Sequence, residues 1–339
     1  MNSVIASRGS KLALWQAHHV KKLLSTLNIE ASILEIKTTG DRIQDRFLHE
    51  IGGKGVFIRE IEEALLAGNA DLGIHSLKDL PAELPQGFAL PAILKRHSPN
   101  DVIVFSKSAS KRLAIPKEVV TQQDLKLFGT LKIATGSLRR KALLQEASSS
   151  IQVLPLRGNV DTRLRKLEDD GYDAIILAEA SLDRLSLKSD FTARAIDPTW
   201  FVPSPSQGAL AIETVAQHHL SDLLKTLSCQ ETAYLVHLER LILSRLGADC
   251  TLPVGIHFQF EARDKGRVLL GRAVILSLTG TSSRAEICIP EEYLLPADKI
   301  ASEMLAKIKA NGGETVMKEL NLKQPLWPSE SVFLKKSPV

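Results

Sequence analysis

Residues 131–154 read LKIATGSLRRKALLQEASSSIQVL, and this stretch decides the fold class. Leu131–Ala134 form an apolar strand pattern, and Ile151–Leu154 form a second one. Between them, residues 138–147 have the pattern of a helix that follows a turn of small residues. A strand, a helix and a strand in this order are typical of a βαβ unit, so we predict an α/β fold with a mainly parallel sheet.

The same alternation continues on both sides of this stretch. Before it, Ser10 can cap a helix that runs to Leu24, and after it residues 160–167 form another helical pattern. The other expected elements are strands at 4–7, 33–36, 70–74, 101–105 and 174–177 and a helix at 57–66. Because the rhythm restarts after Pro99, we expect two α/β lobes of similar size.

Two segments are expected to connect these lobes. Residues 98–103 and 199–206 contain prolines and serines and have the composition of linkers. The strand pattern at 208–213 can then return the chain to the first sheet. We predict a hinge with a cleft between a first domain of residues 1–98 and 203–226 and a second domain of residues 99–202.

The pattern changes from residue 227 onward. A long helix is expected at 231–245, followed by three consecutive strands at 254–262, 267–279 and 284–289 and a final helix at 297–311. Consecutive strands with short turns indicate an antiparallel sheet. We therefore predict a smaller α+β domain over 227–320 and a proline-containing, poorly ordered tail over 321–339.

Composition limits the class of protein. The 339 residues are 44% hydrophobic and 24% charged, as in soluble globular proteins, and suffice for two or three domains. A net charge of +4 is too small to indicate a nucleic-acid partner. Three cysteines, no signal peptide and no apolar run of membrane-spanning length favour a cytoplasmic protein. The nine histidines show no metal-site spacing, so we expect no metal.

One acidic side chain follows a predicted strand in the motif IHSLKDLP at 74–81. Ligands of open α/β sheets bind at the carboxyl ends of strands, where Asp79 is expected. A carboxylate there can act as general acid and base. The alternative is that Asp79 only begins the turn before Pro81.

Basic side chains follow several other predicted strands. Arg139 and Arg140 begin a helix, where cations oppose the helix dipole and a bound anion would relieve that cost. The alternative is a solvated run of charge. Arg8, Arg157 and Arg163 occupy similar places, and guanidinium groups bind carboxylates with two hydrogen bonds. Their repetition predicts a ligand with several carboxylates.

Two loops complete the candidate features. The glycine-rich stretch 51–56 lacks the spacing of a phosphate-binding loop, and residues 41–56 are better interpreted as a mobile lid. Cys250 lies in a loop between a helix and a strand. From its surroundings alone, it is most simply an ordinary buried thiol.

Several motifs together resemble one known family. They include HSLKDLP at 75–81, SLRR at 137–140, RGNV at 157–160 and SQGA at 206–209. Over about residues 3–320 the chain resembles the porphobilinogen deaminases, also called hydroxymethylbilane synthases. The resemblance implies three domains, two of them like periplasmic binding proteins, and a monomer.

The resemblance also implies the chemistry. A dipyrromethane cofactor would be held by a thioether to Cys250, and four porphobilinogen molecules would be added to it head to tail. Asp79 would protonate the departing amine and stabilise the cationic azafulvene that results. Hydrolysis would then release hydroxymethylbilane, with no metal or nucleotide involved.

Further residues match family positions that bind the cofactor and substrate carboxylates or form the lid. The carboxylate-binding positions are Arg8, Ser10, Ser76, Lys78, Thr135, Ser137, Arg139, Arg140, Arg157, Arg163 and Arg184. Lys54 and Phe57 match the lid and the helix that follows it. The alternatives are a two-lobed anion receptor without catalysis and a degenerate relative without turnover; Cys250 and the third domain argue against a plain receptor.

Overall fold

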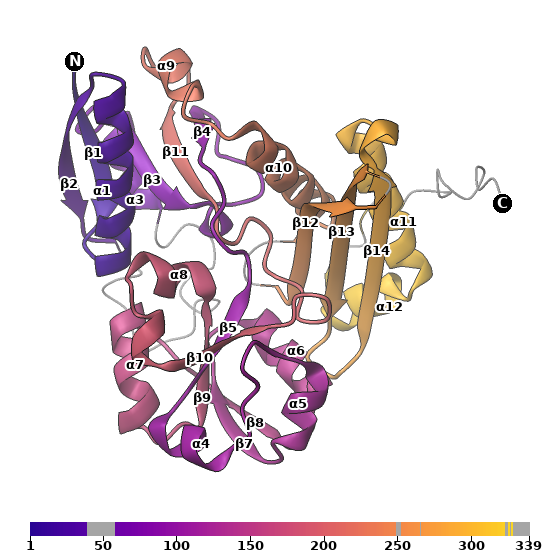
Figure 1. Cartoon of the computed structure of the whole chain (residues 1–339). Helices are drawn as coiled ribbons and strands as arrows, with labels where there is room; N and C mark the ends of the chain where they lie inside the picture. The colour runs from indigo at the N-terminus through magenta and orange to yellow at the C-terminus, as the bar shows by residue number, and fades with distance from the viewer. Residues whose placement is uncertain (39–57, 249–251, 265, 323–324, 326, 328–339) are drawn as a thin grey trace.

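Three β-sheets organise the chain in the computed structural model (Figure 1). The structure describes residues 1–38, 58–248, 252–264, 266–322, 325 and 327. The predicted α/β fold with two lobes and a smaller α+β domain is confirmed. Each lobe is built around one sheet, and the third sheet lies beside them.

The first lobe is built on a five-stranded sheet of order β2-β1-β3-β11-β4. Its strands are β1 (Asn2–Arg8), β2 (Glu30–Ile36), β3 (Leu72–Ser76), β4 (Phe88–Ile93) and β11 (Leu210–Val215). Its helices are α1 (Lys11–Thr26), α3 (Arg59–Leu66) and α9 (Ser221–Lys225), and the 3-10 turn η2 (Leu77–Asp79) follows β3. The predicted cap is confirmed, because the Ser10 side chain accepts a hydrogen bond from the amide of Ala13.

The second lobe is built on a six-stranded sheet of order β6-β10-β5-β9-β7-β8. Its strands are β5 (Asp101–Phe105), β6 (Val119–Val120), β7 (Leu131–Ala134), β8 (Ile151–Leu154), β9 (Ala174–Ala178) and β10 (Thr192–Ile196). Its helices are α4 (Lys107–Arg112), α5 (Gln122–Leu127), α6 (Leu138–Ala147), α7 (Val160–Asp169) and α8 (Glu179–Arg184), with the 3-10 turn η3 (Lys188–Asp190).

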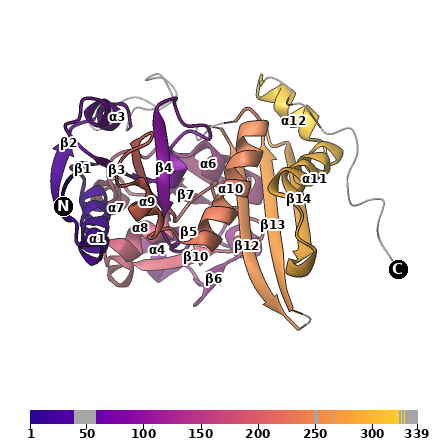
Figure 2. The same ribbon diagram turned by 90° about the horizontal axis from the view of Figure 1, so that it is seen from above.

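The third sheet is antiparallel, as predicted, with the order β12-β13-β14. It comprises β12 (Val254–Arg263), β13 (Gly266–Leu276) and β14 (Ser282–Pro290). Its helices are α10 (Gln230–Arg245), α11 (Ala297–Ala310) and α12 (Gly313–Glu319), with the 3-10 turn η4 (Glu291–Tyr293). The helices α11 and α12 lie along the outer side of this sheet (Figure 2).

The prediction of mainly parallel sheets is wrong for the strands that lie next to the crossovers. β1 pairs with β2 and β3 in parallel, but β11 pairs with β3 and β4 in the antiparallel direction. In the second lobe, β5 is likewise antiparallel to β9 and β10. These strands enter their sheets from the other lobe rather than through a local helix, and only the local βαβ connections require parallel strands.

Two crossover segments join the lobes and touch one another. The amide of His97, between β4 and β5, donates to the carbonyl of Gly208, which precedes β11. Gly208 has a φ of +91°, and a Cβ at this position would lie 2.5 Å from the carbonyl oxygen of His97. Only glycine tolerates both constraints, so the two crossovers pack tightly together at one junction, to which we give the name of the predicted hinge.

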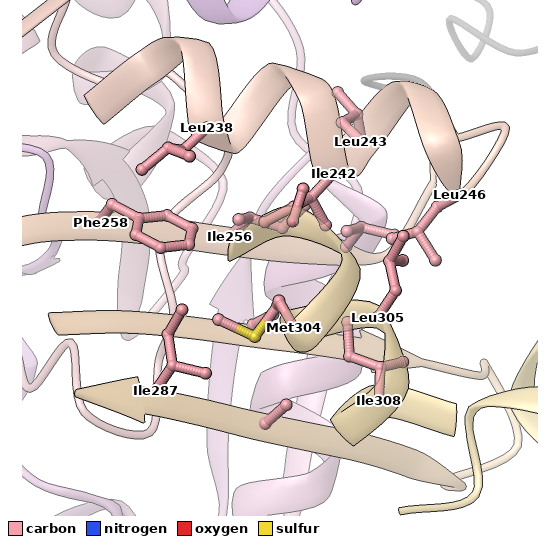
Figure 3. Packing of buried hydrophobic residues seen from close by; sticks show 14 of the residues in the cluster. Leu238, Ile242, Leu243, Leu246, Ile256, Phe258, Ile287, Met304, Leu305 and Ile308 are labelled. Carbon is pink, nitrogen blue, oxygen red and sulfur yellow. The ribbon is translucent and has the colours of Figure 1, made fainter. Parts of the chain in front are cut away.

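The third domain has its own core, in which α10 and α11 cover one face of the sheet (Figure 3). Phe258 of β12 is fully buried there beside Leu238 and Met304. A Cβ at Gly271 of β13 would lie 2.3 Å from the Phe258 ring, so this glycine leaves room for the phenylalanine. On the other side, Val274 of β13 packs into the core of the second lobe.

One expectation at the C-terminus needs correction, and a second falls mostly outside the described residues. The helix predicted to be the last ends at Ala310, and a second helix, α12, begins at Gly313 because Gly312 turns the chain with a φ of +91°. The poorly ordered tail was expected from residue 321, but Leu322 and Trp327 pack against the core of the third domain. Most of the tail lies outside the described residues.

Replacing Phe258 with alanine tests this core. Because the ring is fully buried, Phe258→Ala is expected to lower the free energy of unfolding by about 3–5 kcal/mol. Leu278→Ala is the control, since Leu278 is 47% exposed and its loss should change stability by less than about 0.5 kcal/mol. Urea unfolding followed by circular dichroism measures both, and equal effects would contradict the packing described.

Candidate active site

The carboxyl ends of strands from both lobes carry the predicted charged residues. Arg8 ends β1, and Ser76 ends β3 and is followed by the turn η2, which contains Lys78 and Asp79. In the second lobe, Thr135 follows β7, Arg157 follows β8 and Arg184 lies in α8 after β9. The two sets therefore project from the edges at which parallel strands of each sheet end.

Electrostatic effects show that these charges lie together. Burial, together with the nearby charges of Arg140 and Arg157, lowers the pKa of Arg163 to about 10. Arg8 from the first lobe acts in the same direction, whereas Asp79 opposes the shift. Four guanidinium groups and one carboxylate thus share a single region between the lobes, which favours the binding of anions.

Asp79 is an exposed carboxylate within this region. Its charge acts on Lys78 beside it and on Arg163 and Arg184 of the other lobe. Burial lowers the pKa of Lys78 to about 8 and that of Arg184 to about 10, and Asp79 opposes both shifts. This position suits a group that exchanges protons with a ligand held by the surrounding cations.

Arg139 and Arg140, at the start of α6, are buried and form ion pairs with the carboxylate of Asp101. Arg139 Nη2 lies 2.7 Å from Asp101 Oδ2, and Arg140 Nη2 lies 2.7 Å from Asp101 Oδ1. Arg139 Nη1 donates to the carbonyl of Val202, and Arg140 Nη1 donates to that of Ile176. Burial tends to raise the pKa of Asp101, but the two guanidinium charges outweigh this and keep it below its ordinary value. The Asp101 carboxylate therefore offsets the cost of two cations at a helix start.

The hydroxyl groups predicted to bind carboxylates take part in local turns. The Ser137 side chain caps α6 by accepting from the amide of Arg140, and Thr135 Oγ1 accepts from the amide of Ser137. Ser10 caps α1. Ser76 Oγ accepts from Gln16 Nε2 at 2.9 Å. These contacts hold the strand ends in place.

Arg184 reaches from α8 to the hinge and to the first lobe. Its Nη2 donates to the carbonyl of Gly208 at 2.7 Å. Its guanidinium carbon lies 5.8 Å from the ring centre of Trp15 in α1, a cation–π distance. This buried arginine therefore ties both lobes to the hinge.

Three predicted residues, Lys54, Phe57 and Cys250, lie outside the described residues. A cavity of about 600 Å³ is lined by residues of α1, α7 and the segment after α8, including Lys11, Asp161 and Phe191, and none of its lining residues is a predicted site residue. Within the described part of the chain, no cluster of three or more acidic, His or Cys side chains could hold a metal ion. Among those same residues, no helix is long and apolar enough to cross a membrane.

Sequence reasoning missed the polar residues that support the site from behind. Asp101 was interpreted only as the start of a strand, and Gln207 lay in a motif without an assigned role. Both are fully buried or nearly so. The available signal for Asp101 was a charged residue at the start of the otherwise apolar run DVIVF, because buried carboxylates require a cationic partner.

Comparison with known proteins decides the family. A family model described as the porphobilinogen deaminase dipyromethane cofactor-binding domain matches residues 3–222. The chain belongs to the porphobilinogen deaminase family. It is 40% identical over 318 residues to the porphobilinogen deaminase of Laribacter hongkongensis, covering 93% of this chain and 96% of that protein. It is 41% identical to that of Nitratidesulfovibrio vulgaris, covering 91% of this chain and 97% of that protein.

More distant relatives and solved structures extend this picture. A probable porphobilinogen deaminase of Methanosarcina acetivorans is 36% identical, covering 93% of this chain and 94% of that protein. The structure of substrate-binding domain 2 of GlnP from Lactococcus lactis aligns with 73% of this chain and 90% of that chain, with 11% sequence identity and a TM-score of 0.40. At that level of structural similarity, the description of the fold rests on this chain's own strand order.

The Asp101 contact is tested by removing its charge. Asp101→Asn leaves Arg139 and Arg140 buried with one fewer negative charge, so we expect a loss of about 3–5 kcal/mol in the free energy of unfolding. Asp222→Asn is the control, because Asp222 pairs with Lys225 on the surface. Denaturant midpoints measure both. A loss below about 1 kcal/mol for Asp101→Asn would contradict the assigned role.

Proposed function

We propose that this protein is a hydroxymethylbilane synthase that deaminates four porphobilinogen molecules and joins them head to tail on a covalent dipyrromethane cofactor. Release of the chain of four rings as hydroxymethylbilane completes the reaction. The observation that carries the proposal is the cluster of arginines from both lobes around the exposed carboxylate of Asp79. Porphobilinogen and the cofactor rings carry acetate and propionate groups that such a cluster can bind.

The residues present fit the cofactor. The pKa of Arg163 is lowered by burial and by the charges of three other arginines, Arg8, Arg140 and Arg157, so several cations gather at this place. A ligand with several carboxylates would relieve this repulsion. When bound, the cofactor supplies the pyrrole carbon to which the first substrate is attached. We propose that Cys250, in the connection between α10 and β12, forms the thioether that holds it.

Asp79 is proposed to be the catalytic residue. Its carboxyl group would donate a proton to the substrate amine as ammonia leaves. The resulting carboxylate would then stabilise the positive charge that develops on the substrate ring and accept the proton lost after the new bond forms. Exposure makes the carboxyl accessible to a substrate, and the charges of Lys78, Arg163 and Arg184 lie close enough to interact with it.

The remaining residues are proposed to bind carboxylates and to enclose the reaction. Arginines and lysine would pair with the acetate and propionate groups, while the hydroxyls fix the strand ends or donate to the same groups. The proposed set is Arg8, Ser10, Ser76, Lys78, Thr135, Ser137, Arg139, Arg140, Arg157, Arg163 and Arg184, with Lys54 and Phe57 at the lid. We further propose that the enzyme acts as a cytoplasmic monomer without a nucleic-acid or membrane partner.

Asp79→Asn tests the catalytic assignment. The variant keeps the shape of the side chain but cannot donate or accept the proton, so kcat should fall by about 10²–10⁴-fold. Asp169→Asn, an exposed aspartate at the end of α7, is the matched control and should retain wild-type turnover. Ammonia release from porphobilinogen measures both. A near-normal rate in Asp79→Asn would remove Asp79 from the mechanism, and wild-type binding without turnover would favour the anion receptor.

Salt dependence tests the arginine assignments. Raising NaCl from about 0.05 M to about 0.5 M should increase KM for porphobilinogen several-fold, because salt screens pairs between guanidinium and carboxylate groups. Arg163→Gln should weaken this dependence. Arg165→Gln, an exposed arginine on the same helix, should leave it unchanged. A KM independent of salt in the wild type would count against binding by charge.

A further inference from the structure

Gln207 is a fully buried amide at the hinge between the lobes. It lies on the return crossover, between β10 of the second lobe and β11 of the first. No charge or exposed position suggests a role for it. Its three side-chain hydrogen bonds, however, all reach segments that carry or support the active site.

The carboxamide joins a cation of one lobe to an anion of the other. Its Oε1 accepts from Lys78 Nζ at 3.1 Å, in the turn that also holds Asp79. Its Nε2 donates to Asp101 Oδ1 at 3.1 Å and to the carbonyl oxygen of Pro99 at 2.6 Å. Asp101 in turn binds the guanidinium groups of Arg139 and Arg140. A continuous chain of polar contacts therefore runs from Lys78 to both arginines.

An amide is the side chain that this place requires. The oxygen faces an ammonium group, which only donates, and the nitrogen faces two oxygens, which only accept. A carboxylate at 207 would repel Asp101, and an apolar side chain would remove the hydrogen bonds to Lys78, Asp101 and Pro99. The chemistry of the three partners also fixes which way the amide points.

We propose that Gln207 is a positioning residue for the reaction, an inference that rests on the proposed function. It holds the Lys78 ammonium group at a fixed distance from the cluster of Asp101, Arg139 and Arg140. Through it, carboxylate-binding groups from the two lobes keep one fixed spacing. Gln207 would act on the substrate through Lys78 and not by direct contact. Its loss should therefore affect substrate binding and the ionisation of Lys78 more than the fold.

The ionisation of Lys78 provides the readout. Burial lowers its pKa to about 8, Asp79 and Asp101 act to raise it, and Arg139 and Arg140 act to lower it. A hydrogen bond accepted by Gln207 favours the charged ammonium. Because only the charged form attracts a carboxylate strongly, binding that depends on Lys78 should weaken as the pH rises through about 8.

Two substitutions at this position should shift the Lys78 pKa in opposite directions. Gln207→Leu removes the acceptor, so the pKa should fall by about 0.5–1 unit. Gln207→Glu places a carboxylate beside the ammonium, so the pKa should rise instead. Both variants lose the donated bonds to Asp101 and Pro99, so a shared loss of stability cannot account for opposite shifts. Gln152→Glu, an exposed glutamine of β8, is the control for the change of charge.

The experiment is an NMR titration of the full-length protein labelled with 13C at the lysine ε carbon, with Lys78→Met identifying the signal. The alkaline limb of kcat/KM for porphobilinogen is measured in parallel and should move with the Lys78 pKa. Unchanged Lys78 titration in both Gln207 variants would overturn the proposal. If Lys78 titrates as expected but the wild type shows no turnover, the positioning contact stands and the proposed function fails.

Discussion

The carboxylate of Asp101 is the interaction on which the rest of the site depends. It is 1% exposed and accepts from Arg139, Arg140 and Gln207. Without it, two buried guanidinium groups at the start of α6 would face the helix dipole and one another, at a high cost in free energy. With it, the arginines become a rigid part of the hinge before any ligand arrives. Because these cations are already in place, the free energy needed to rearrange them when carboxylates bind is smaller.

A second buried carboxylate connects the third domain to the same hinge. The Glu239 carboxylate of α10 accepts hydrogen bonds from both terminal nitrogens of Arg96, which lies on the crossover from β4 to β5. It also accepts one from the amide of Ser206, on the crossover from β10 to β11. Burial tends to raise its pKa, but Arg96 and His257 lower the pKa to about 2. Glu239 thereby holds α10 and β12, the two elements that flank the segment carrying Cys250, against both crossovers. The domain that is proposed to anchor the cofactor and the cations that would bind it thus share one framework.

Local patterns predicted what local forces determine, and the rest required the tertiary structure. The βαβ rhythm placed Arg8, Thr135 and Arg157 at strand ends, because helices and short turns follow from neighbouring residues. The antiparallel entry of β11 could not be predicted, since it depends on a crossover from the other lobe. Lys78 and Gln207 are 129 positions apart, and nothing in either stretch indicates the other. The place of Asp79 after a strand left it either an acid–base group or a turn residue. Its proposed proton transfer to the amine, and the thioether at Cys250, came from the family resemblance and not from spacing or periodicity.

Covalent attachment of the cofactor is tested by the mass of the purified protein under denaturing conditions, with peptide mapping around Cys250. We expect an added mass equal to two linked pyrroles, located on the peptide that contains Cys250 and absent from Cys250→Ser. An unmodified peptide that stays unmodified after incubation with porphobilinogen would contradict a covalent dipyrromethane cofactor and, with it, the proposed reaction.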